Sequence, residues 1–418
     1  MALGETGQRS EGKGLVGRDS RAFFRRGSAS PRRRSSARRN NVQATEPMRV
    51  GLFGMITSLR SIACLAALGC GAAPSSSSTV APVTTTHVVV TPLGNDVYAA
   101  VRTEPLGLAV NSNSVFIVND DHVVVVDAQF TRAATLETLA ALRRITRKPV
   151  RFVINTHWHD DHVAGNQVYQ DSFPGVRFIA HTNTRTDLIS KGRDNRAGQV
   201  KFAPPIADRL ERLLGMGLGS DSTPATDMER TSLTSAITIV RQYLAENAAY
   251  REVLPDSLFD WTLTLDAGGR IIELHWFGRA NTRGDAVTYL PREGIVSTGD
   301  LVVAPMPFGF GSYPSEWISV LDSVAALRPR VVVPGHGPVM RDLSYVKQVQ
   351  RMLVAVRDSV RVAAANGLSA DSTVKVVRLT QLRSRLAGTE KWMNWAFGYF
   401  FRQPVVSRAY EEAKGTLQ

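Results

Sequence analysis

Short apolar runs separated by turn-forming residues follow one another along the first half of the folded part of this chain. Their alternation and their valine-rich composition predict β-strands at residues 87–91, 97–102, 115–118, 123–126 and 150–155. Between the last two strands, Leu136, Leu139 and Leu142 recur at helical spacing. This spacing predicts a helix over residues 133–146, which the following Pro149 prevents from continuing.

The second half repeats this order of strands and helices after a long middle segment. Residues 184–261 are predicted to be mostly helical. Beyond them the pattern predicts strands at 261–265, 271–276, 286–290, 295–298 and 331–333, and helices at 317–327 and 343–365. Two similar halves favour two sheets packed face to face with helices outside, a four-layer αββα sandwich of the α/β class. We expect this domain at 87–345, with 184–261 as a helical insertion and 346–418 as a helical C-terminal extension packed on it.

The first 86 residues differ from the rest. Residues 1–47 are rich in Gly, Ser and Arg without an apolar period, which predicts a disordered basic arm or an over-long reading frame. From Met48 or Met55, a basic residue, an apolar run and small residues follow in the layout of an export signal. Cys70 ends a segment that resembles a bacterial lipoprotein box, so lipidation and plain cleavage are both open. We therefore expect export to the periplasm or cell envelope, with 48–86 as signal and tether. Membrane anchoring through a lipid on Cys70 is one of the two open outcomes.

Composition and charge narrow the choice of partners. The chain is 43% hydrophobic and 21% charged, which is typical of soluble globular proteins. The net charge of +13 lies mainly in residues 1–60, where 13 Lys and Arg face 4 Asp and Glu, so only +4 remains for the rest. The expectation is a small-molecule substrate and no specific nucleic-acid partner. Both cysteines, Cys64 and Cys70, precede the predicted domain, so no disulfide framework or cysteine-based zinc cluster is expected in it.

Three histidines and two aspartates lie within six residues directly after the strand predicted at 150–155. The segment is His157-Trp158-His159-Asp160-Asp161-His162. Imidazole and carboxylate are ligands that Zn²⁺ takes, and a tight loop at the end of a strand brings alternate side chains to one point. A solvated polar loop is the alternative, but an apolar strand leads straight into the cluster. The cluster therefore predicts a metal site.

The cluster resembles the His-x-His-x-Asp-His signature of the metallo-β-lactamase superfamily. The signature falls on His157, His159, Asp161 and His162. Three further motifs match in order, and they contain Asp127 at the end of an apolar strand, Asp300 after Gly299, and His336 in Pro-Gly-His-Gly. The matches span about residues 88–338. The resemblance implies an αββα metallohydrolase, similar to the glyoxalase-II-like branch, with zinc as its cofactor.

The resemblance also implies two metal positions. Site 2 would contain Asp161, His162, Asp300 and His336. Site 1 would contain His157 and His159, with Asp300 as a bridge, and a histidine that this chain replaces with Asn281. An amide oxygen is a harder donor than imidazole and suits Ca²⁺ or Mg²⁺ better than Zn²⁺. We therefore expect one or two zinc ions, with site 2 favoured.

One zinc ion suffices for hydrolysis, because it lowers the pKa of bound water from about 15.7 toward 7 and polarises a carbonyl group. Asp161 is expected to position or deprotonate the attacking water. Asn281 is interpreted either as a degraded ligand or as an amide donor to the developing oxyanion. Within the family, an aspartate at the position of Asp300 is typical of ester, thioester, lactone and phosphoester hydrolases.

The predicted function is therefore zinc-dependent hydrolysis of an ester, thioester or lactone-like carbonyl. A class B-like β-lactamase is one alternative, and a non-catalytic surface binding protein with a decayed metal site is another. Candidates for supporting roles next to the metal are His181, Asp127 and Thr282, although a hydrogen-bonded structural role is the alternative for His181. Candidates for lining the cleft are Trp158, Phe308, Phe310, Tyr313 and Trp317, with core packing as the alternative for Trp317.

Overall fold

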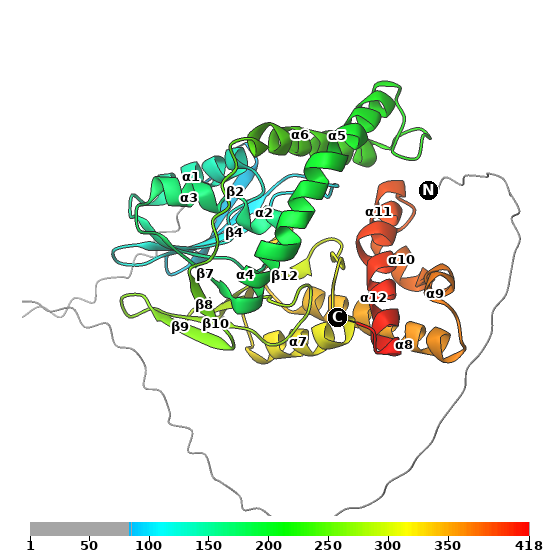
Figure 1. The fold of residues 1–418 in the computed structure, drawn as a ribbon. Helices are drawn as coiled ribbons and strands as arrows, with labels where there is room; N and C mark the ends of the chain where they lie inside the picture. Colours follow the sequence, from blue (N-terminus) through cyan, green and yellow to red (C-terminus); the bar gives the residue numbers. More distant parts are fainter. Residues whose placement is uncertain (1–82, 85, 418) are drawn as a thin grey trace, which may run out of the picture. The chain divides into compact units, whose positions relative to one another are not determined.

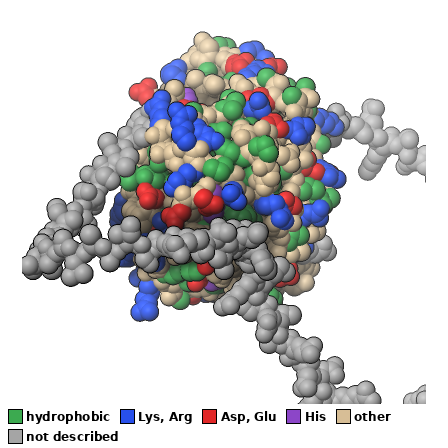
Figure 2. Space-filling view, turned by 90° about the vertical axis from the view of Figure 1, so that its left-hand side faces the viewer, with side chains coloured by type: hydrophobic (Ala, Val, Ile, Leu, Met, Phe, Trp, Pro, Cys, Tyr) green, Lys and Arg blue, Asp and Glu red, His purple; other side chains and the backbone are tan. Residues whose placement is uncertain are grey.

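The computed structural model describes residues 83–84 and 86–417, all within one compact unit (Figure 1). The expected basic arm, the export signal and Cys70 lie outside the described residues. Within the part of the chain that the structure describes, no helix is both long enough and apolar enough to cross a bilayer. On the face drawn in Figure 2, basic and acidic side chains are interspersed with hydrophobic and other side chains.

The first sheet has eight strands that pair in chain order. They are β1 (Val83–Thr84), β2 (Val88–Gly94), β3 (Val97–Arg102), β4 (Ser114–Val118), β5 (Val123–Val126), β6 (Val150–Ile154), β7 (Arg177–His181) and β8 (Ser257–Phe259). Neighbours from β1 to β5 are antiparallel and those from β5 to β8 are parallel. Parallel neighbours require crossover connections. The crossovers before β7 contain α1 (Arg132–Ile145), α2 (Asp160–Val163) and α3 (Asn166–Ser172).

The second sheet has five strands in the order β13-β12-β11-β10-β9, of which β12 and β13 are parallel. Their bounds are β9 (Thr262–Asp266), β10 (Ile271–His275), β11 (Val287–Leu290), β12 (Ile295–Val303) and β13 (Val331–His336). These strands confirm the predicted ones. However, β12 and β13 continue past the apolar runs that predicted them. The strands continue because pairing between them satisfies the backbone hydrogen bonds even where the side chains become polar. The added residues include Asp300 in β12 and His336 in β13.

Strand residues alternate between two apolar layers, as a side-chain period of two requires. In β4, Phe116 and Val118 pack under α1 and α3, whereas Val115 and Ile117 face the second sheet. In β13, Val332 packs toward the helices on the far side of the second sheet. The core therefore has one layer between the sheets and one on each outer face, and the structure confirms the four-layer αββα arrangement.

Helices form the insertion and the C-terminal region. The insertion contains α4 (Thr182–Asp187), a π-helical turn η1 (Leu188–Gly192), α5 (Arg193–Gly215) and α6 (Asp227–Asn247). The outer helices and the C-terminal region are α7 (Pro314–Ala326), α8 (Ser344–Ala365), α9 (Ala370–Val376), α10 (Thr380–Ala387), α11 (Lys391–Ala396), η2 (Phe397–Arg402) and α12 (Gln403–Lys414). Most of the middle segment is helical, as predicted, but residues 257–259 near its end form strand β8. This short segment pairs in parallel with the edge of β7 and so joins the first sheet.

Candidate metal centre

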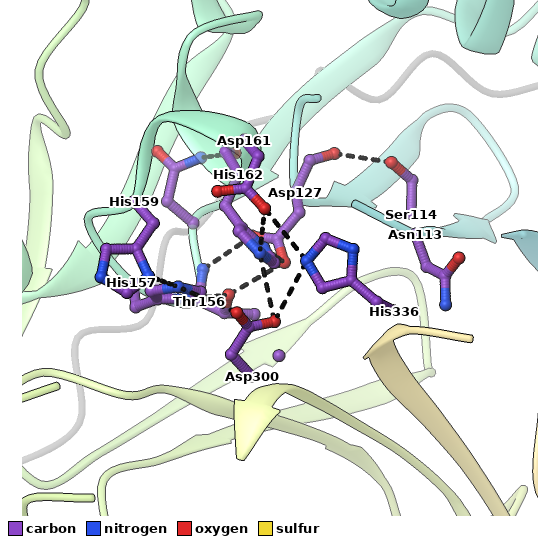
Figure 3. A network of polar contacts seen from close by, with 12 residues as sticks. Asn113, Ser114, Asp127, Thr156, His157, His159, Asp161, His162, Asp300 and His336 are labelled. Carbon is purple, nitrogen blue, oxygen red and sulfur yellow. Dashed lines mark hydrogen bonds and ion pairs between the residues drawn. The ribbon is translucent and has the colours of Figure 1, made fainter. Parts of the chain in front are cut away.

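The histidine-rich loop lies at the carboxyl end of β6, between the two sheets. β6 is parallel to both of its neighbours, so its end opens beside the ends of β5 and β7. The loop then passes directly into α2, which begins at Asp160. From the second sheet, β12 supplies Asp300 and β13 supplies His336. The predicted ligands therefore come from both sheets and lie close together (Figure 3).

Four side chains form the group that corresponds to site 2. Their ligand atoms, on Asp161, His162, Asp300 and His336, all lie within 4.8 Å of one another. His162 Nε2 is 3.3 Å from both Asp161 Oδ2 and Asp300 Oδ1, and His336 Nε2 is 3.0 Å from Asp161 Oδ2. This is a compact set of two imidazoles and two carboxylates.

Three further atoms form the group that corresponds to site 1. His157 Nε2 is 2.8 Å from His159 Nδ1 and 3.7 Å from Asp300 Oδ2. His157, His159 and Asp300 satisfy the same 4.8 Å limit as the first group. Asp300 thus belongs to both groups, one carboxylate oxygen toward each.

Buried atoms without hydrogen bonds show that this donor set fits a cation. His162 Nε2, Asp300 Oδ1 and His336 Nε2 are buried and make no hydrogen bond among the described residues. Their polar neighbours are one another and Asp161, in ion-pair contacts of 3.0–3.4 Å. Leaving such atoms unsatisfied is costly. Two imidazole nitrogens with two carboxylates are ligands suited to Zn²⁺, and three imidazole or carboxylate groups are available at the other position. The residues present therefore fit the zinc that the family usually binds.

Neighbouring groups hold the imidazoles with the correct nitrogen toward the centre. The Nδ1 of His162 lies 2.8 Å from Asp127 Oδ2, and the Nδ1 of His336 lies 3.1 Å from the carbonyl oxygen of Asn111. Donation from Nδ1 to these oxygens leaves the Nε2 lone pair for a metal. Asp127 also accepts from the backbone N–H of Thr156 at 2.8 Å. The structure thus places Asp127 in the supporting position that the sequence suggested.

The carboxylates and imidazoles of the group shift each other's pKa values. Burial raises the pKa of Asp161 and Asp300, but the imidazoles of His162 and His336 outweigh burial, so both carboxyls have a pKa below the ordinary value. Burial and the neighbouring imidazoles lower the pKa of His157 well below its ordinary value, so this side chain is neutral. Burial also lowers the pKa of His162 and His336, but the carboxylates outweigh burial and raise it above the ordinary value, so the two kinds of group stabilise each other's charged forms. Metals bind ionised carboxylates and neutral imidazoles, so these two histidines would release their protons on binding a cation.

Two glycines allow the second sheet to reach the centre. A Cβ on Gly335 would lie 2.1 Å from Asp300 Oδ1, so any side chain there would displace the shared carboxylate. Gly299 has a φ of +51°, and a Cβ there would lie 2.6 Å from Thr156 Oγ1. Glycine is required at both positions by close approach and, at Gly299, by a left-handed backbone.

Asn281 is buried at the edge of the centre. Its Nδ2 donates to the carbonyl oxygen of Phe308, and its Oδ1 is buried without a hydrogen-bond partner among the described residues. The amide oxygen is thus the end left for a cation or a substrate donor. This arrangement supports the interpretation as a weak ligand more than that as an oxyanion donor, since one N–H is already used.

The other two supporting candidates make their hydrogen bonds elsewhere. His181 Nε2 is 2.9 Å from the carbonyl oxygen of Asp260, and its Nδ1 accepts from the backbone of Asn183. Both ring nitrogens of His181 therefore have structural partners. The backbone N–H of Thr282 donates to Asp285 at 2.7 Å, which holds the turn that carries Asn281.

A cavity of about 470 Å³ adjoins the centre and includes His159 and Asn281 in its wall. The rest of the wall contains Trp158, Asp187, Ser190, Lys191, Thr282, Arg283, Phe310, Gly311, Tyr313 and Arg408. Three of the five aromatic residues suggested by the sequence lie in the wall. Phe308 and Trp317 are buried in the core instead, and the indole N–H of Trp317 donates to the carbonyl oxygen of Leu301.

Sequence reasoning missed the residues that support the ligands from a distance. The carbonyl of Asn111 orients His336, and Asn113 Nδ2 donates to the carbonyl oxygens of Pro334 and Gly337 on either side of it. The only available signal was the unusual polar run Asn111-Ser112-Asn113 before an apolar strand. Such a run indicates buried polar partners without indicating which ones.

Comparisons with known proteins place the chain in a family. The model of a family described as the metallo-beta-lactamase superfamily matches residues 107–336, more than half of the chain. A linear primary-alkylsulfatase from Pseudomonas sp. (strain ATCC 19151) is 23% identical over 298 residues, which cover 66% of this chain and 51% of that protein. The chain thus spans about half the length of this curated relative.

Solved structures with the same fold include the stereoselective inverting sec-alkylsulfatase Pisa1 from Pseudomonas sp. It is 14% identical, with a TM-score of 0.53, over 77% of this chain and 50% of that chain. A metallo-beta-lactamase from Pontibacter korlensis is 20% identical, with a TM-score of 0.45, over 64% of this chain and 99% of that chain. The motifs, the converging ligand atoms and the match to the family model agree. The chain therefore belongs to the metallo-β-lactamase superfamily of metallohydrolases.

Proposed function

We propose that this protein is a zinc-dependent hydrolase of small ester-type substrates, the predicted ester, thioester and lactone-like carbonyls together with sulfate esters. The observation that carries the proposal is the group of buried, unsatisfied ligand atoms on His162, Asp300 and His336 beside an open cavity. Bound zinc supplies a Lewis acid and lowers the pKa of water toward neutrality. The relative named as a linear primary-alkylsulfatase supports the inclusion of sulfate esters.

Asp161 is the residue best placed to orient the attacking water and accept its proton. Its side chain is 20% exposed, whereas those of His162, Asp300 and His336 are at most 8% exposed. Burial raises the pKa of its carboxyl, but the imidazoles of His162 and His336 outweigh burial and lower that pKa, so the carboxyl is ionised and its oxygens can accept a hydrogen bond from water. Of the four site 2 side chains, Asp161 is the carboxylate with the most access to solvent, which is why we assign it this role.

The cavity wall favours a substrate with a negative group and an apolar part. Lys191, Arg283 and Arg408 lie in the wall with one carboxylate, Asp187, so the charge of the wall is positive. Arg283 pairs with Asp187 at 2.5 Å and Lys191 lies 3.5 Å from it. A substrate carboxylate or sulfate would find two cations that share this one carboxylate.

Aromatic rings extend from the cavity wall toward the C-terminal helices. The ring of Phe310 lies 5.5 Å from that of Tyr399, which stacks on Trp395 at 4.9 Å. Phe310 and Tyr399 are 41% and 43% exposed, respectively. This aromatic surface supports binding of the apolar part of the substrate.

The test is a substrate panel offered to the full-length protein after purification without chelator. The panel contains a thioester, a lactone, a p-nitrophenyl ester, an alkyl sulfate and a chromogenic cephalosporin. We expect hydrolysis of at least one ester-type compound, loss of that activity in His162→Ala, and recovery after chelation only when zinc is returned. Turnover of the cephalosporin alone would favour the β-lactamase alternative, and no zinc-dependent turnover would favour the non-catalytic binding protein.

A further inference from the structure

A buried polar cluster connects the helical insertion to the metal-binding loop. Asp160 occupies the variable position of the family signature, one residue before Asp161, and is buried. Its Oδ2 accepts from the hydroxyl of Tyr243 on α6 at 3.1 Å, and its Oδ1 lies 3.4 Å from Arg196 Nη2 on α5. Two helices from the insertion therefore meet at one carboxylate on the loop.

Rings on both sides hold this cluster in place. The guanidinium of Arg196 lies over the ring of Tyr250 at 3.4 Å and over that of Tyr243 at 4.9 Å. The ring of Tyr243 stacks on Phe130, with centroids 4.4 Å apart. Phe130 follows β5 closely in the chain, so the stack also connects α6 to the first sheet. A cluster packed in this way has little freedom to move.

Asp161 needs such support more than the other ligands of site 2. His162 and His336 receive hydrogen-bond partners from Asp127 and Asn111, and Asp300 lies within the paired strand β12. Asp161 lies on α2, a single four-residue turn whose N-terminus has no side-chain cap. One turn of helix is not stable by itself. Among the described residues, the Asp161 side chain makes ion pairs only with His162 and His336.

We propose that Asp160 is a positioning residue that fixes Asp161 at the metal centre by connecting α2 to the insertion through Tyr243 and Arg196. The insertion then has a role in metal binding in addition to its contribution to the cavity wall. This proposal rests on the metal centre proposed above, because a positioning role for Asp161 has meaning only if site 2 binds a metal.

The experiment measures zinc affinity by competition with a chromophoric chelator, using the full-length protein. Asp160→Asn and Tyr243→Phe are expected to weaken zinc binding by about tenfold or more, the magnitude typical of residues that orient metal ligands. Tyr243→Phe keeps the ring that stacks on Phe130, so it tests the hydrogen bond if Asp160→Asn fails to fold. Arg196→Lys keeps the positive charge and should retain more zinc affinity than Arg196→Met.

Asp208→Asn is the matched control. Asp208 is an exposed residue of α5 that pairs with Arg241 of α6, so it joins the same two helices without contact to the loop. We expect unchanged zinc affinity in this variant, and a Co²⁺ absorption spectrum that changes in Asp160→Asn but not in Asp208→Asn. With an ester substrate, Asp160→Asn should lower kcat and leave KM nearly unchanged, since the cavity wall is intact.

The outcomes separate this proposal from the one on which it rests. If the wild-type protein binds no zinc, the metal centre itself is wrong and the positioning role fails with it. If the wild type binds zinc, and Asp160→Asn and Tyr243→Phe bind it equally well, only the positioning role is overturned. The same holds if these variants lose thermal stability while zinc affinity and the Co²⁺ spectrum stay unchanged.

Discussion

Asn281 is the residue at which this chain departs from the ligand pattern that the family resemblance implies. Its amide N–H is used by the carbonyl of Phe308, and its oxygen is left buried without a partner. The ligand atoms of His157, His159 and Asp300 nevertheless converge, and His159 shares a cavity wall with Asn281. We therefore propose that position 281 determines how tightly site 1 binds a metal, while site 2 has the full set of ligands that the family resemblance implies.

Asn281→His is expected to raise the zinc content of the protein by completing site 1 with an imidazole. Turnover should rise with it, because imidazole is a better zinc donor than an amide oxygen. Metal content by plasma mass spectrometry and initial rates check this, with Asn281→Ala as the control that should bind no more zinc than the wild type. Unchanged zinc with reduced turnover would mean that the amide acts on the substrate instead.

At the scale of elements, the insertion also makes a polar contact with the C-terminal region, separate from the Asp160 cluster. Lys391, at the start of α11, lies 2.7 Å from Asp221 and 2.9 Å from the buried Glu229. Thr226 at the N-cap of α6 also donates to Glu390 at 2.8 Å. The loop between α5 and α6 is therefore held against α11.

The Asp221 contact should withstand mild acid. Hydrogen bonding to Lys391 lowers the pKa of Asp221 to about 2, although burial opposes this, and an ordinary aspartate has a pKa of 3.8. A lowered acid pKa gives stability that is present above pH 3.8 and is lost as the pH falls toward 2. The melting temperature of the wild type should therefore exceed that of Asp221→Asn by a constant amount from pH 7 to about 4.5. A difference that disappears already at pH 5 would contradict this.

Most elements were predictable because burial on one face leaves a period in the sequence. Strands β4 and β5 and helix α1 follow their apolar patterns closely. Strand β8 was not predictable, since three residues at the edge of a sheet are too few to show a period and depend on β7 for pairing.

In the metal centre, the predicted ligands follow from their local motif. The contact of Asp160 with Arg196 and Tyr243 depends on how distant helices pack, and the sequence does not encode that locally.

At the scale of the whole molecule, the metal centre depends on the packing of the two sheets. Asp161 and His162 follow a strand of the first sheet, whereas Asp300 and His336 lie on strands of the second. The apolar layer between the sheets holds these two pairs together. A bound ion would in turn stabilise the packed sheets, by an amount that grows with ion concentration.

Ile117→Ala tests this layer, because Ile117 is fully buried between the sheets. The free energy of unfolding should fall by about 2–5 kcal/mol, the range for truncating a large aliphatic side chain in a core. The matched control is Leu136→Ala on α1, which is 44% exposed and should change stability by less than about 0.5 kcal/mol. Urea unfolding followed by tryptophan fluorescence measures both variants. Equal effects would show that the layer between the sheets does not dominate stability.

The metal content of the full-length protein, purified without chelator and measured by plasma mass spectrometry, tests the centre most directly. Because His162 Nε2, Asp300 Oδ1 and His336 Nε2 are buried and unsatisfied, we predict at least one zinc ion per chain. That ion should be lost in both His162→Ala and His336→Ala, in protein that remains folded by circular dichroism. A wild-type protein without metal, or zinc retained at the same content in both variants, would contradict a metal centre at these residues.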